Sequence, residues 1–167
     1  MSIATSVKGA ALGAMSGLAG AGAMAASSKL EQLLTQRPNS YVPGHTLAHL
    51  LGLRDPDADR WGRNMAMHYA SGAIAGVLRG VMSAANLHGP FASLMHANLR
   101  LSFDQTLENA TGVGAPPWTQ PRDELLIDVA EKTVFGVATG AVADALISPP
   151  TSSARRPALG ARLKGFA

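Results

Sequence analysis

Glycine recurs at every fourth position in two separate segments of this chain. Positions i and i+4 lie on one face of a helix, so each set would form a groove without side chains. Small residues at this spacing let helix backbones approach closely, above all in lipid. The pattern predicts tightly packed helices, a glycine zipper, and Gly136 with Gly140 repeats it near the end of the chain. The two sets are Gly9, Gly13 and Gly17, and Gly72, Gly76 and Gly80.

Breaks in the sequence divide the chain into helices. Prolines and glycines at 37–44, 88–90 and 111–121 interrupt the helical patterns, and no segment alternates as a strand would. The fold expected is all-α, with four long Gly/Ala-rich helices at about 9–34, 58–85, 91–109 and 121–148. A short helix near 45–53 is expected at the membrane interface, and Asp55-Pro56-Asp57 is expected to cap the second long helix. Residues 1–148 are predicted to form the helical membrane bundle, and 149–167 a flexible basic tail.

Composition places this bundle in a membrane. Charged residues make up 15% of the chain, against roughly 25% in soluble proteins. Residues 9–28 carry no charge, and about 20 apolar residues cross a bilayer core. Cleavage after a signal peptide, near Ala21-Gly22-Ala23, is the alternative to an uncleaved first helix. Trp118 suits an interface anchor, while Arg79 within the second long helix requires a partner or a path to the interface.

The expected partners follow from the same composition. The localisation predicted is a membrane, crossed several times, with the lipid bilayer and either a second copy or another membrane protein as partners. No basic stripe interleaved with aromatic residues exists, so no nucleic acid is expected, and the basic tail fits anionic lipid. The chain has no cysteine, and His45 with His49 is a weak metal signal, so neither a metal nor a cofactor is expected.

Titratable residues within apolar helical segments are the candidate site. In membrane segments such residues indicate function, and a buried set can exchange protons as general acid and base. The structural alternative is neutralisation, with Arg100 pairing with Asp104 and Lys132 pairing with Glu131. A four-residue step from His96 to Glu108 forms one stripe, and the last long helix offers another that includes Lys132 and Asp144. The candidate catalytic residues are His68, His96, Arg100, Asp104, Glu108, Asp128 and Glu131.

A short motif precedes the second long helix: Leu51-Gly52-Leu53, one further residue, then Asp55-Pro56. With the glycine-spaced helix that follows, it resembles small bacterial inner-membrane proteins of the YagU-like type. The resemblance covers residues 8–147 through the helix order and implies a multi-pass helical membrane protein. It carries over no activity and no catalytic residues, and this chain departs from the pattern in its sparse aromatic residues and long basic tail.

These observations lead to three functional hypotheses. The first is a multi-pass integral membrane protein with a structural or accessory, partner-docking role and no chemistry of its own. The alternative is a small membrane-embedded acid/base enzyme of the cyclase or isomerase type, acting on a lipophilic substrate in a biosynthetic pathway. A proton or ion conductor ranks third, because the sequence shows no pore-lining pattern.

Overall fold

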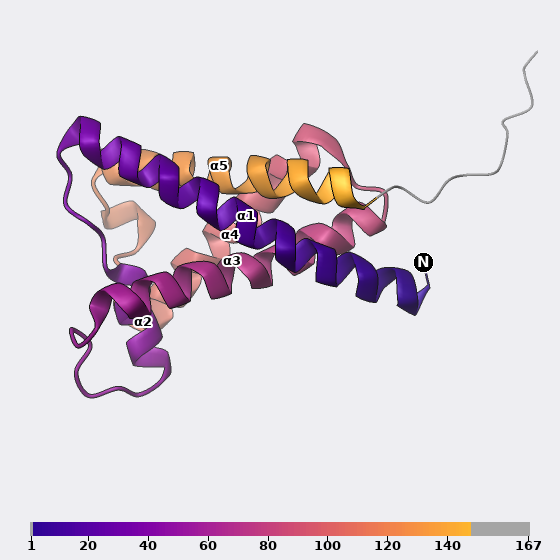
Figure 1. The fold of residues 1–167 in the computed structure, drawn as a ribbon. Coiled ribbons are helices and arrows are strands. Elements are labelled where there is room, and N and C mark those ends of the chain that lie inside the picture. The colour runs from indigo at the N-terminus through magenta and orange to yellow at the C-terminus, as the bar shows by residue number, and fades with distance from the viewer. Residues whose placement is uncertain (1, 148–167) are drawn as a thin grey trace, which may run out of the picture.

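Five α-helices and one short 3₁₀ turn make up the part of the chain that the computed structural model describes, residues 2–147 (Figure 1). No strand occurs within these residues, so the all-α prediction of four long helices and a short one is confirmed. The tail expected at 149–167 lies outside the described residues. The elements are α1 (Ile3–Thr35), α2 (Val42–Leu50), α3 (Arg60–Ala84), α4 (Gly89–Ala110), η1 (Pro117–Thr119) and α5 (Arg122–Leu146).

The start of α3 differs from the sequence prediction. Asp59 is the N-cap, in a left-handed conformation with φ of 47°, and its carboxylate accepts a hydrogen bond from Gly62 N at 3.2 Å. Asp55 instead closes the preceding turn, where its Oδ1 accepts from the backbone N–H groups of Asp57 and Ala58. The predicted cap at 55–57 is therefore wrong, because the turn takes up the first aspartate and a later one caps the helix.

Helices α1 and α3 run antiparallel with their backbones in contact. A Cβ added at Gly13 would lie 2.7 Å from the Cα of Gly80, and one added at Gly17 would lie 2.8 Å from the Cα of Gly76. Both distances are below 3.0 Å, which real Cβ atoms essentially never reach. The two glycine sets therefore face each other. We call this contact the glycine seam; it comprises Gly9, Gly13 and Gly17 of α1 and Gly72, Gly76 and Gly80 of α3.

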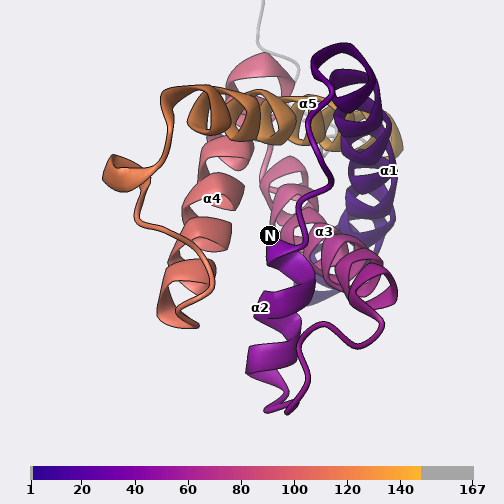
Figure 2. The same ribbon diagram turned by 90° about the vertical axis from the view of Figure 1, so that its left-hand side faces the viewer.

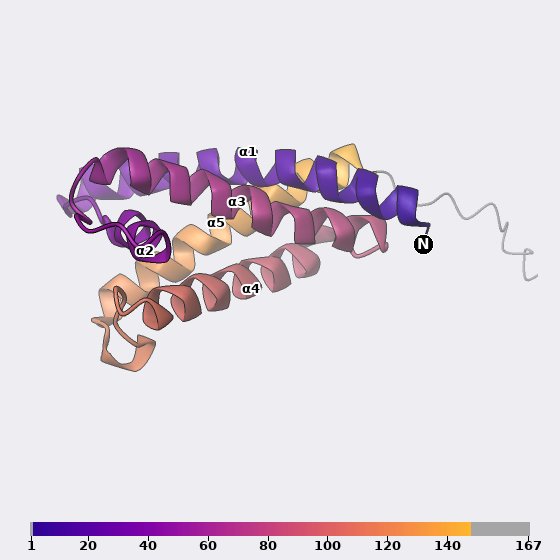
Figure 3. The same cartoon turned by 90° about the horizontal axis from the view of Figure 1, so that it is seen from below.

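Helix α5 joins this pair to α4. It crosses obliquely from the side of α4 to the side of α1, whereas α3 and α4 diverge from the turn that connects them (Figures 2 and 3). Small residues again allow the helices to pack closely. Gly20 of α1 faces Thr139 of α5, and Gly136 of α5 faces Ala97 of α4. Helix α2 packs beside the first turns of α3, where Gly44 donates its N–H to the side chain of Asn64.

The bundle buries as many polar or charged residues as hydrophobic ones. The described part of the chain buries ten polar or charged residues and ten hydrophobic ones, and six of the latter are alanine. Twenty-six large hydrophobic side chains are exposed, although soluble monomers rarely expose extended apolar surface. By length and composition, α1 alone among the described helices could cross a membrane. The all-helical bundle is thus established.

The glycine seam predicts opposite effects for two Gly→Ala substitutions in α1. Gly17→Ala introduces a Cβ against the α3 backbone and is expected to destabilise the fold by about 1–3 kcal/mol. Gly22→Ala is the matched control, because a Cβ there meets nothing within 4 Å; it is expected to gain up to about 1 kcal/mol from helix propensity. Thermal unfolding followed by circular dichroism measures both, and equal effects would contradict the seam.

Candidate functional site

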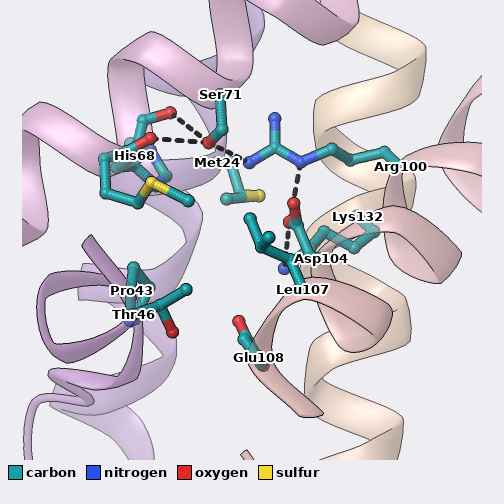
Figure 4. Close-up of a pocket in the computed structure, with 11 residues that line it drawn as sticks. Met24, Pro43, Thr46, His68, Ser71, Arg100, Asp104, Leu107, Glu108 and Lys132 are labelled. Atoms are coloured by element: carbon teal, nitrogen blue, oxygen red, sulfur yellow. Dashed lines mark hydrogen bonds and ion pairs between the residues drawn. The ribbon is translucent and has the colours of Figure 1, made fainter. Parts of the chain in front are cut away.

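A small polar cavity lies where α2 meets the four long helices (Figure 4). Its volume is about 30 Å³, and one water molecule requires roughly 10–15 Å³, so it has room for about two. All five helices contribute to its wall. The lining residues are Met24, Pro43, Thr46, Met67, His68, Ser71, Arg100, Asp104, Leu107, Glu108 and Lys132.

Charges of alternating sign run along one wall of the cavity. Arg100 Nε donates to Asp104 Oδ2 at 2.7 Å, and Lys132 Nζ lies 3.5 Å from the same oxygen. Lys132 also donates to Asp128 Oδ1 at 2.8 Å, and Arg100 Nη2 donates to Ser71 Oγ at 2.7 Å. The carboxylates compensate the two buried cations, as buried charges require.

Glu108 stands apart from these ion pairs. It lines the cavity, and none of the salt bridges among residues 2–147 includes it. Burial raises the pKa of Glu108 to about 7; nearby Asp104 and Asp128 act in the same direction, while Lys132 and Arg100 oppose them. This carboxyl group therefore gains or loses its proton near neutral pH, which suits a proton donor or acceptor.

The other predicted site residues lie outside or at the edge of the cavity. His68 lines it, but its Nε2 is hydrogen-bonded to the carbonyl oxygen of Ala21 at 2.9 Å, an extension of the α1–α3 contact. His96 lies outside it and contacts the carbonyl oxygen of Ala75 at 2.8 Å. Asp128 reaches the cavity only through Lys132.

Glu131 corrects one of the predicted ion pairs. Its Oε1 lies 3.6 Å from Nη2 of Arg37, in the loop after α1, and the expected pair between Glu131 and Lys132 does not form. Adjacent residues on a helix point in different directions. Lys132 therefore turns inward to Asp104 and Asp128, while Glu131 turns toward α1. The predicted pair of Arg100 and Asp104 is confirmed.

A second polar cluster, at the opposite end of the bundle, was not among the predicted site residues. Arg79, fully buried, donates through Nη2 to both carboxylate oxygens of Asp144 at 2.8 Å. The same carboxylate accepts from Ser83 Oγ and from the backbone N–H of Gly89, and it lies 3.0 Å from His88 Nδ1. The need of Arg79 for a partner was the available signal, but no spacing in the sequence pointed to Asp144, 65 positions later.

The small volume of the cavity and the ion pairs around it limit the chemistry that these clusters could perform. The polar cavity could hold water but no organic substrate in this conformation. Within residues 2–147, no three His, Asp or Glu side chains come together as metal ligands. No protein family, curated protein or solved structure matches this chain. The resemblance to YagU-like proteins therefore stays a prediction.

The Arg79–Asp144 pair predicts a large loss of stability on removal of one partner. Asp144→Ala leaves the buried guanidinium without its carboxylate and is expected to cost about 3–5 kcal/mol. Adding Arg79→Met to that variant removes the uncompensated charge and should restore much of the loss. Unfolding midpoints of the single and double variants measure this. Additive losses in the double variant would show that the two residues are not coupled.

Glu108 predicts a pH-dependent stability. Its pKa is raised from 4.5 to about 7, so between these values the folded chain binds the proton more tightly than the unfolded chain. The stabilisation is complete below pH 4.5 and is lost as pH rises to about 7. In Glu108→Gln this decline should be absent, so the unfolding temperature of the unmodified protein should fall relative to that of the variant as pH rises from 4.5 to about 7. Parallel curves from pH 4 to 8 would contradict the assignment.

Proposed function

We propose that this protein is a multi-pass integral membrane protein in which α1, α3, α4 and α5 cross the bilayer. Its role is structural or accessory: it docks onto another membrane protein or a second copy of itself. The twenty-six exposed large hydrophobic side chains, beside an interior with as many polar as hydrophobic residues, carry the proposal. A lipid environment removes the cost of exposed Leu, Ile and Phe side chains, and in lipid interhelical packing and hydrogen bonds hold helices together.

A band of the surface without exposed charge supports four crossings. It comprises residues 9–28 of α1, 64–84 of α3, 89–103 of α4 and 132–147 around α5. The charged residues within it, Arg79, Arg100, Lys132 and Asp144, are all buried or half-buried and paired. At 1.5 Å per residue the α1 and α3 segments are about 30 Å long and the α4 and α5 segments about 22–24 Å, against a hydrocarbon thickness of about 30 Å. For α4 and α5 the proposal therefore requires local thinning of the bilayer or flanking side chains that reach the interface.

The average composition of the later helices conceals their outward faces. In α3 the interior positions hold Ser71, Arg79 and Ser83, which are all buried, while Ile74 and Val77 are exposed. The mean hydropathy along a helix counts its interior and outward faces together. By that mean, α1 alone among the described helices is apolar enough to cross a membrane. A lipid-facing stripe is apolar regardless of what the interior of a bundle contains.

The α2 end of the bundle fits a membrane interface. Trp61 and Trp118 are both exposed near the α2 end, where most charged residues of residues 2–147 also gather. Tryptophan is enriched where hydrocarbon meets the polar headgroups. Glu108, Asp123 and Glu124 lie at this end as well, outside the four segments of the band.

An accessory role without chemistry agrees with the state of the candidate residues. Asp104 and Asp128 are held in ion pairs, and the cavity beside them has room for about two water molecules. One observation favours the alternative of an acid/base enzyme: Glu108, in the cavity, has no ion-pair partner within residues 2–147. That alternative requires α2 to move away and admit a lipophilic substrate.

Single cysteines test the crossings cleanly, because the chain has none of its own. Arg54→Cys and Ala85→Cys lie in exposed turns at the two ends of α3. In sealed, oriented vesicles we expect a membrane-impermeant maleimide to label them from opposite sides. Ile74→Cys and Val137→Cys, exposed in the structure, should stay unlabelled until detergent is added.

Alkaline carbonate washing supplies the control for insertion. The proposal expects all four cysteine variants to remain in the membrane pellet. Labelling of both turns from the same side would exclude a crossing by α3. Release by carbonate together with labelling of all four positions would overturn the membrane proposal as a whole.

A further inference from the structure

The end of α2 and the turn that follows it expose three leucines. Leu50, Leu51 and Leu53 are 50%, 63% and 40% exposed. Single exposed leucines are common on soluble proteins, but leucines this close together form a continuous apolar surface, which is typical of an interaction site. We call residues 50–54 the leucine tip.

The leucine tip has a defined backbone conformation. Gly52 lies in the left-handed region with φ of 64°. Its N–H donates to the carbonyl oxygen of His49 at 3.1 Å, and the N–H of Leu53 donates to that of Ala48 at 2.9 Å. These two hydrogen bonds form a Schellman motif, which ends the helix. Because the turn is closed by its own hydrogen bonds, little ordering is required when the leucines meet a partner.

Arg54 is the charge that the leucine tip offers to a partner. It is exposed and forms no ion pair within residues 2–147. The three aspartates that follow it are engaged locally. Asp55 and Asp59 accept hydrogen bonds from backbone N–H groups, and Asp57 lies 3.1 Å from Nε2 of His45. The tip therefore presents leucines beside a guanidinium group, a donor that suits phosphate.

The orientation of α2 directs the leucine tip sideways from the bundle. The helix lies across α3 in Figure 1 and is seen nearly end-on in Figure 3. In Figures 1 and 2 its last turn and the loop after it project beyond the four long helices. Its first turn is fixed to α3, where Gly44 N–H donates to Asn64 Oδ1 at 3.0 Å. Asn64 is the first residue of the band without exposed charge in α3, so α2 lies at the edge of that band.

We propose that the leucine tip inserts into the bilayer leaflet at the α2 end, with its leucines among the acyl chains and Arg54 on phospholipid phosphate groups. With the long helices across the bilayer, an apolar turn that projects sideways at this level meets lipid, whereas a soluble partner would contact the end of the bundle. The long side chain of arginine reaches the headgroups while its stem stays in hydrocarbon. The inference rests on the membrane location proposed above.

Insertion of the leucine tip has a consequence for the polar cavity. Pro43 and Thr46 of the same helix line that cavity. A tip held in the leaflet therefore keeps one wall of the cavity at the membrane surface.

Fluorescence quenching of the full chain in vesicles of phosphatidylcholine and phosphatidylglycerol tests the insertion. An environment-sensitive fluorophore is attached to Leu51→Cys. Spin-labelled lipids quench it from within the bilayer, with the spin label either near the headgroup or near the chain end, and iodide quenches it from water. We expect stronger quenching by the shallow lipid label than by the deep one, at a depth of about 5–10 Å in the headgroup and acyl boundary.

Two further single cysteines calibrate the depth. Ile74→Cys, exposed within the band, should be quenched most by the deep lipid label. Ala58→Cys, exposed in the loop after the leucine tip, should be quenched by iodide.

Substitutions in the leucine tip separate specific insertion from general contact with lipid. Leu50→Ser with Leu53→Ser should lose most of the lipid quenching at residue 51 and gain quenching by iodide. Leu33→Ser with Leu34→Ser is the matched control, because these leucines are also exposed at the α2 end, and it should keep the quenching of the unmodified tip. In both variants the reporter at residue 74 checks that the bundle is still inserted.

Arg54→Gln tests the phosphate contact. It should move the reporter at residue 51 toward water, because the variant loses the charge that pairs with phosphate. An unchanged depth would overturn the role of Arg54.

The outcomes distinguish this inference from the membrane proposal. Iodide quenching at residue 51 as strong as at residue 58, with residue 74 deep in lipid, would overturn insertion of the tip and leave the four crossings intact. Equal lipid quenching in the two double-serine variants would do the same. Protection of residue 51 from both lipid and iodide would mean that a protein covers the tip, which also overturns its insertion. Absence of lipid quenching at residue 74 as well as residue 51 would overturn both proposals.

Discussion

The close contact of α1 and α3 is the constraint on which the rest of the bundle depends. With glycine at the seam, the two backbones approach until an added methyl group would collide, as the 2.7 Å distance at Gly13 shows. Such a contact buries little side-chain area, so its stabilisation comes from dispersion between backbone atoms rather than from a large apolar core. The seam also fixes the groove that receives α5, where Gly20 meets Thr139.

A core built from glycine and alanine leaves the larger side chains two places to go. Most of the large apolar side chains point outward, although Met24, Met82, Phe135 and Ile147 are buried, and the buried charged ones pair inside toward the two ends of the bundle. The pair of Arg79 and Asp144 connects α3 to α5, and Asp144 also accepts a hydrogen bond from Gly89 at the start of α4. At the other end, Arg100 connects α4 to α3 through Ser71, and Lys132 connects α5 to α4 through Asp104. Between these clusters α3 and α4 hardly touch, and an apolar cleft occupies that space. The close packing of the helices and the apolar outer surface thus both follow from the Gly/Ala-rich composition.

The structure brings only some of the predicted site residues together, for reasons that individual residues make clear. The four-residue step placed Arg100, Asp104 and Glu108 on one face of α4, and all three line the polar cavity. His96 follows the same step but lies one turn further along, beyond the cavity, because α2 covers only the end of the bundle. Glu131 was paired with the wrong cation, since sequence proximity does not fix the direction in which a side chain leaves a helix.

The sequence by itself determined the helices, their breaks and the presence of a groove without side chains, because these follow from local periodicity and from the geometry of glycine and proline. It also indicated that Arg79 requires a partner. Only the tertiary structure decided that the two glycine sets face each other, that Asp144 is the partner and that α3 and α4 diverge around a cleft. These features join positions up to 71 residues apart, as Gly9 and Gly80 are, and such contacts depend on how whole helices cross, which no short pattern encodes.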